Sequence, residues 1–141
     1  MVSNYPIILK KSEEGYAVGC PALPGCWSQG KTEEEAIDNI KVAINEYLEV
    51  VRESFAEEEF REIEIALKSF RMPEIPGVSH KLAIKALGKA GFKVIREGKH
   101  TILGDGTRFL TIPRHNPINS YTLGGIVRDA GLSVKEFKKL L

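Results

Sequence analysis

The chain has 141 residues, enough for one ordinary domain or two small ones, and 43% hydrophobic with 28% charged residues is typical of a globular protein. No apolar run is long enough for a membrane-spanning helix. Residues 1–11 lack the basic, apolar and small-residue sections of a signal peptide. These features exclude a membrane-spanning protein and favour a cytoplasmic one.

The net charge of +1 conceals a sharp division between the two halves of the chain. Residues 1–72 hold 8 basic and 14 acidic residues, a net charge of −6, whereas residues 73–141 hold 12 basic and 5 acidic residues, a net charge of +7. A basic half is suited to a polyanion, and an acidic half is suited to cover it. The alternative is that the acidic residues only form a solvated helix face.

The N-terminal half reads as three short strands followed by a helix. Residues 5–11, 16–20 and 26–29 are the expected strands. Thr32 and Glu35 have the spacing of a capping box, and apolar residues at helical spacing follow as far as Val51. Residues 55–70 fit either a helix or, as we prefer, a strand near 61–66.

Two local features complete this half. Cys20 and Cys26 flank a short loop without further metal ligands nearby, so we interpret them as small packed side chains rather than as a metal site. Residues 71–77 contain two prolines and a glycine, which predicts a linker. The expected division is therefore 1–70, a linker at 71–77, and 78–141.

The C-terminal half reads as helix, three strands, helix, helix. Ser79 is the expected cap of the first helix, and strands are expected at 92–96, 100–103 and 108–112, the last two joined by a hairpin turn. Thr122 is the expected cap of the next helix, and Ser133 with Glu136 forms a capping box for the last. This order predicts an α+β fold with helices on one face of an antiparallel sheet.

The residues of the N-terminal half resemble those of HicB-type antitoxins. The resemblance runs over about residues 5–52 and rests on Tyr16-Ala17-Val18, on the loop at 21–26, on 29–32, and on Glu35-Ala36. It implies a partial RNase H-like fold. Many HicB antitoxins continue into a DNA-binding domain, whose place is taken here by the basic half, so DNA binding is not expected.

The C-terminal half resembles HicA-type toxins over about residues 75–141. The matching segments are 90–92, Gly98-Lys99-His100, Pro113-Arg114-His115 and 122–132. The resemblance implies a fold similar to double-stranded-RNA-binding domains and activity as an mRNA interferase, a ribosome-independent RNA endonuclease. Many HicA toxins have serine at the position of Lys99.

RNA cleavage of this kind needs no metal and no cofactor, because the ribose 2′-hydroxyl is the nucleophile. It needs a base, an acid and positive charge at the phosphate. His100 is the candidate catalytic residue, since imidazole titrates near neutral pH; a surface histidine on a strand is the alternative, and the resemblance favours catalysis. Lys99 and His115 are supporting candidates, although His115 also fits a polar loop residue. The candidate RNA contacts are Lys93, Arg96, Arg108 and Arg114.

The acidic half lacks the paired carboxylates of two-metal hydrolysis, since none occurs in residues 7–11, and we expect it to be inert. Its role would be to shield the basic half. A short linker gives a high effective concentration of inhibitor, and if it is too short for contact within one chain, a swapped homodimer results.

Two other functions remain open. One is a non-catalytic RNA-binding or nucleic-acid-binding module. The other is a transcriptional regulator that places the helix at 122–130 in a major groove, although this helix contains only one basic residue, Arg128, and a Gly124-Gly125 pair.

Overall fold

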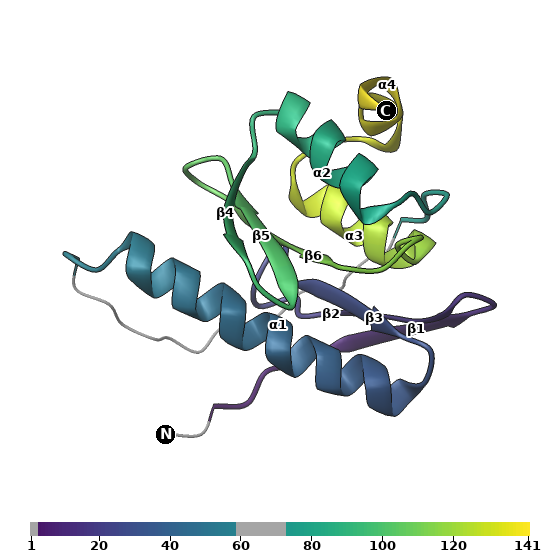
Figure 1. Ribbon diagram of the computed structural model, residues 1–141. Coiled ribbons are helices and arrows are strands. Elements are labelled where there is room, and N and C mark those ends of the chain that lie inside the picture. The colour runs from purple at the N-terminus through teal and green to yellow at the C-terminus, as the bar shows by residue number, and fades with distance from the viewer. Residues whose placement is uncertain (1–2, 59–72) are drawn as a thin grey trace.

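The computed structural model describes residues 3–58 and 73–141 (Figure 1). The first half consists of an antiparallel sheet and one long helix. The strands are β1 (Ile8–Ser12), β2 (Gly15–Gly19) and β3 (Trp27–Gly30), in the order β1-β2-β3, and the helix is α1 (Glu33–Ser54). The expectation of a strand near 61–66 lies outside the described residues.

Helix α1 begins where the sequence predicts. The Thr32 hydroxyl accepts a hydrogen bond from the Glu35 N–H at 3.1 Å, and three glutamates occupy the first turn, where the helix dipole favours negative charge. One stripe of the helix is buried, and it contains Ala36, Ile40, Ala43, Tyr47 and Val50. This stripe packs against the first sheet and leaves the acidic faces of the helix available to other partners.

The second half has the expected order of elements. It contains α2 (His80–Lys89), β4 (Lys93–Glu97), β5 (His100–Gly104), β6 (Phe109–Pro113), α3 (Ser120–Asp129) and α4 (Val134–Leu140). The strands form an antiparallel sheet in the order β4-β5-β6. Figure 1 shows α2, α3 and α4 together on one side of the molecule and α1 on the other. The α+β class is confirmed.

The start of α3 differs from the sequence prediction. The cap is Asn119, whose side-chain oxygen accepts from the N–H groups of Tyr121 and Thr122, and the prediction of Thr122 as the cap was wrong. The Thr122 hydroxyl instead donates to the Ser28 carbonyl at 3.0 Å. The predicted caps Ser79 and Ser133 are confirmed.

The two sheets meet at β3 and β6. The Thr111 N–H donates to the Gly25 carbonyl at 2.7 Å, and the Trp27 N–H donates to the Thr111 hydroxyl at 2.7 Å. A single parallel bridge between Cys26 and Thr111 continues the contact. Strand β6 therefore belongs to the second sheet and is also tied to the first.

Trp27 anchors the first half in the core of the second. Its side chain is 1% exposed and belongs to the same hydrophobic cluster as residues of α2, β6 and α3. Its indole N–H donates to Asp129 of α3 at 2.7 Å, and Asp129 also accepts from the Gly25 N–H at 2.9 Å. Gly125 provides the space for the ring, since a Cβ there would lie 2.1 Å from the indole. Trp27 thus joins the two halves through the core of the second, while the first sheet and α1 form a cluster of their own.

Candidate functional site

His100 begins β5 at the contact between the two halves. Its side chain is buried, and both of its polar partners come from the N-terminal half. Its Nε2 lies 2.7 Å from the Ser28 hydroxyl, and its Nδ1 lies 3.3 Å from a carboxylate oxygen of Glu46. The same carboxylate lies 3.3 Å from the backbone N–H of His100. Ser28 and Glu46 thus bracket the ring from β3 and α1.

The surroundings of His100 favour a neutral imidazole. Burial lowers the pKa of His100, and the hydrogen bond to Glu46 opposes that effect in part. A neutral ring with its proton on Nδ1 satisfies both contacts: Nδ1–H donates to Glu46, and Nε2 accepts from the Ser28 hydroxyl. In this arrangement the basic lone pair of the ring is occupied.

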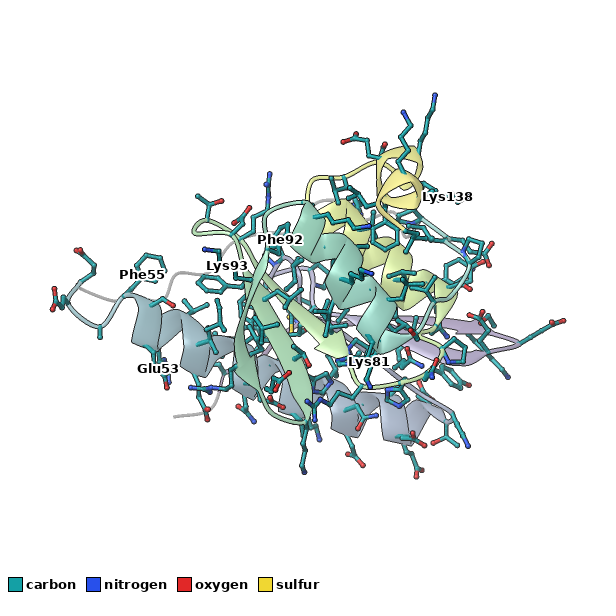
Figure 2. The ribbon with its side chains drawn as sticks, turned by 45° about the horizontal axis from the view of Figure 1, so that its top comes forward. Glu53, Phe55, Lys81, Phe92, Lys93 and Lys138 are labelled. Carbon is teal, nitrogen blue, oxygen red and sulfur yellow. The ribbon has the colours of Figure 1, made fainter. Side chains whose placement is uncertain are left out.

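Arg96 is held by the same face of α1. Its guanidinium donates to Glu49 at 2.8 Å and also donates to Glu53. The pKa of Arg96 is raised by these carboxylates, first by the hydrogen bond to Glu53. Glu46, Glu49 and Glu53 follow one another at helical spacing, so one ridge of α1 faces the C-terminal half. Figure 2 shows Glu53 on α1 near the end of that helix.

Arg114 and His115 lie in a groove beside the buried histidine. The groove has a volume of about 660 Å³ and is also lined by His80 and Lys81 at the start of α2. Burial lowers the pKa of His115. His115 is close enough to His100 to lower the pKa of His100 as well. Lys99 is exposed on the turn between β4 and β5.

Two of the expected RNA contacts lie away from His100. Lys93 pairs with Gly104 at the far end of the β4–β5 ladder, about 13 Å along the strand from His100 at 3.3 Å a residue. Arg108 lies near the same end, 3.8 Å from Asp105. Lys93 therefore lies far from His100, because an antiparallel pairing places the start of β4 opposite the end of β5.

Sequence reasoning missed four residues at this place. Ser28 gave no signal because it lies inside a short buried strand, and Glu46 was one of many acidic residues. His80 and Lys81 follow a helix cap, and the sequence places them on α2 without indicating that α2 begins beside Arg114. The spacing of Glu46, Glu49 and Glu53 on one helix face was the only available signal.

Helix α3 is unsuited to a major groove in this fold. Its residues from Ser120 to Val127 are buried with the exception of Tyr121, which is half-buried, and Arg128 is its exposed basic residue. Within the described ranges, no cluster of three or more His, Cys, Asp or Glu side chains is placed to hold a metal ion. No helix in those ranges combines the length and apolar character needed to cross a membrane.

Two family models match the chain, one over its acidic half and the other over its basic half. Residues 5–80, more than half of the chain, match the model of the HicB-like antitoxin of bacterial toxin–antitoxin systems. The chain belongs to the HicB-like antitoxin family. Residues 81–132 match the model of the HicA toxin of the same kind of system. The protein therefore combines a HicB-like antitoxin with a HicA-like toxin in one toxin–antitoxin chain.

Curated relatives match about a third of this HicB–HicA chain. A UPF0150 protein of Thermoplasma acidophilum is 52% identical over 50 residues, which are 35% of this chain and 72% of the relative. A UPF0150 protein of Synechocystis is 51% identical over 49 residues, 34% of this chain and 62% of the relative. A 14.9 kDa protein from the rep–hol intergenic region of Haemophilus phage HP1 is 47% identical over 45 residues, 32% of this chain and 34% of that protein. No solved structure matches the chain.

Proposed function

We propose that this chain is a self-inhibited RNA endonuclease. Residues 78–141 form a metal-independent mRNA interferase with His100 as its proton-transfer group, residues 1–70 form its inhibitor, and residues 71–77 link them. The observation that carries the proposal is the imidazole of His100 held between Ser28 and Glu46 of the other half. A catalytic base held in this way has no lone pair left for a substrate.

The chemistry requires one bond to form and one to break. Once exposed, Nε2 of His100 takes the proton of a ribose 2′-hydroxyl, and the 2′-oxygen attacks the adjacent phosphorus. The bond from phosphorus to the 5′-oxygen breaks, which leaves a 2′,3′-cyclic phosphate. The leaving 5′-oxygen takes a proton from an acid, for which His115 is the nearest candidate. Cations such as Arg96, Arg114 and Lys99 would stabilise the charge on the phosphate.

Inhibition is explained by the partners of these groups. The Ser28 hydroxyl contacts Nε2 of His100 as a ribose hydroxyl would, at 2.7 Å. The carboxylates of Glu49 and Glu53 contact Arg96 as phosphate oxygens would. The inhibitor therefore presents a hydroxyl and anions in place of the corresponding groups of RNA.

Catalysis should appear when the charges of the acidic ridge of α1, formed by Glu46, Glu49 and Glu53, are reversed in the full chain. The variant Glu46→Lys/Glu49→Lys/Glu53→Lys places three cations opposite Arg96 and His100. Like charges across this contact weaken it. We expect the variant to cut single-stranded RNA in the presence of a chelator, and adding His100→Ala should abolish the cutting. Product analysis should find 2′,3′-cyclic phosphate ends.

A matched variant controls for net charge. Asp38→Lys/Glu57→Lys/Glu58→Lys makes the same change in charge at exposed positions that make no hydrogen bond or ion pair with the C-terminal half in the described structure. It should remain as inactive as the parent chain. Equal cleavage by the parent and the ridge variant would refute self-inhibition, and cleavage that survives His100→Ala would refute the catalytic role. RNA binding without cleavage by every variant would instead support a non-catalytic binding module.

The contact between the halves lies within one chain in this structure, and a swapped homodimer with the same contacts stays a prediction. Sedimentation of the parent chain distinguishes the two arrangements. A dimer that dissociates in the ridge variant would place the same inhibitory contact between chains.

A further inference from the structure

A basic groove remains open beside the buried histidine. We define the basic groove by Lys81, Arg114, His80, His115 and Glu97, which line a cavity of about 660 Å³. This volume lies within the range of ordinary ligand sites, about 300–1,000 Å³. Its lining comes entirely from the C-terminal half, so the docked inhibitor does not fill it.

The cations of the basic groove form no ion pairs within the described residues. Both of them, Lys81 and Arg114, are exposed. Glu97 is the one carboxylate of the lining. After burial, the charge of Arg114 is the main cause that lowers the pKa of His80, so the guanidinium lies near His80 in the groove lining.

The basic groove also contains an unsatisfied polar atom. Nδ1 of His115 is buried and has no hydrogen-bond partner among the described residues. A buried polar atom without a partner costs about 1–3 kcal/mol. A turn of the His115 ring toward the groove would let a ligand oxygen or hydroxyl supply the missing partner.

The basic groove adjoins the strand that carries His100. His80 contacts the Thr101 hydroxyl at 2.9 Å, and Thr101 follows His100 in β5. Pro113, which pairs with His100 across the sheet, precedes Arg114 in the chain. Because successive side chains of a strand point to opposite faces of the sheet, the groove reaches the backbone of β5 beside His100 from the face opposite to the imidazole.

We propose that the basic groove binds the phosphodiester backbone of RNA in the inhibited chain, so that the inhibitor prevents cleavage without preventing RNA capture. This inference rests on the proposed function, since RNA as the polyanion follows from it. In the described structure the acidic ridge pairs with one C-terminal cation, Arg96, and leaves Lys81 and Arg114 exposed. The blocked chain is then an RNA-binding protein that holds RNA while its nuclease is inhibited.

The test measures binding by the full, inhibited chain. The probe is a fluorescein-labelled 20-nucleotide single-stranded RNA of mixed sequence, followed by anisotropy at several salt concentrations. We expect the parent chain to bind and Lys81→Glu/Arg114→Glu to bind at least about tenfold more weakly. The slope of the logarithm of the binding constant against the logarithm of the salt concentration should be less steep by about 1.4, for two lost phosphate contacts. Lys81→Gln/Arg114→Gln should weaken binding in the same direction, and circular dichroism should show that both variants are folded.

The matched control is Lys138→Glu/Lys139→Glu, the same charge reversal on α4. Figure 2 shows Lys81 at one end of α2 and Lys138 on α4 well away from it. The control should change the affinity by less than about threefold. Equal losses in both charge-reversed variants, or no binding by the parent chain, would overturn the inference. Cleavage by the ridge variant of the previous section is scored separately, so a failure of binding and a failure of the nuclease are distinguishable.

Discussion

Removing the carboxylate of Asp129 should weaken the contact between the two halves. In the variant Asp129→Ala the indole N–H of Trp27 and the backbone N–H of Gly25 both lose their acceptor, at 2.7 and 2.9 Å respectively. Each hydrogen bond to a charged group contributes about 1.5–3 kcal/mol, and burial of the orphaned donors adds to the loss. We expect the free energy of unfolding to fall by about 3 kcal/mol.

The measurement uses a probe that the sequence supplies. Trp27 is the only tryptophan of the chain, so its fluorescence reports on the contact between the halves. With a urea slope of about 1.5–3 kcal/mol/M, a loss of 3 kcal/mol lowers the unfolding midpoint by about 1–2 M. Far-UV circular dichroism follows both halves together. A fluorescence transition that precedes the dichroism transition would show that the halves part before they unfold.

Asp38→Ala is the matched control. Asp38 is exposed on α1, and its removal should change the free energy of unfolding by less than about 0.5 kcal/mol. An Asp129→Ala variant with the midpoint of the parent chain would refute the view that this carboxylate fastens the two halves.

Two further predictions concern packing and pH. Gly125→Ala should destabilise the fold by about 1–3 kcal/mol, because its Cβ would lie 2.1 Å from the buried ring of Trp27. Gly88→Ala, which has open space around it on α2, should instead stabilise the fold by about 0.5–1 kcal/mol. Equal melting temperatures for the two variants would contradict this packing. Burial lowers the pKa of all three histidines, so the unfolded chain binds more protons below about pH 6.5 and stability should fall as the pH is lowered from about 7.5 to 5.5. Urea midpoints measure that slope, which should be smaller in His100→Asn, and an unchanged slope would contradict the assigned burial.

The order of elements could be predicted because it depends on local signals. Ser79 and Ser133 cap their helices as their spacing indicates, and a hairpin turn at 105–108 joins β5 to β6. The cap of α3 could not be predicted in the same way. Thr122 has the right side chain for a cap, but its hydroxyl is used by the Ser28 carbonyl of the other half, and Asn119 is one turn earlier. A tertiary contact decided between two acceptable local choices.

The candidate site could be predicted only in part, because tertiary contacts decide which residues surround it. The sequence identifies His100 and Arg114 as chemistry-bearing residues, but their neighbours depend on how the halves dock. Ser28 lies 72 residues from His100 in the chain, and Glu46 lies 54 residues away. The charge division predicts that the acidic half faces the basic half, and the packing of α1 on its own sheet determines that the ridge with Glu46 is the face that does so.

Release of the toxin should resemble partial unfolding more than simple undocking. Trp27 of the first half is part of the main hydrophobic cluster of the second, and Glu14 of the first half accepts from the N–H and hydroxyl of Ser120 at the start of α3. Cutting the linker removes the effective concentration supplied by the chain, but it removes none of these contacts. Ile75 is buried in the core of the second half, and its N–H donates to the Ser120 carbonyl, so the nick belongs on the N-terminal side of Pro73. Such a nick should leave the proposed nuclease inhibited. While Glu46, Glu49 and Glu53 are intact, active enzyme should appear only when the shared core is also disturbed, as by Asp129→Ala. The combination of nick and substitution should therefore exceed either change alone.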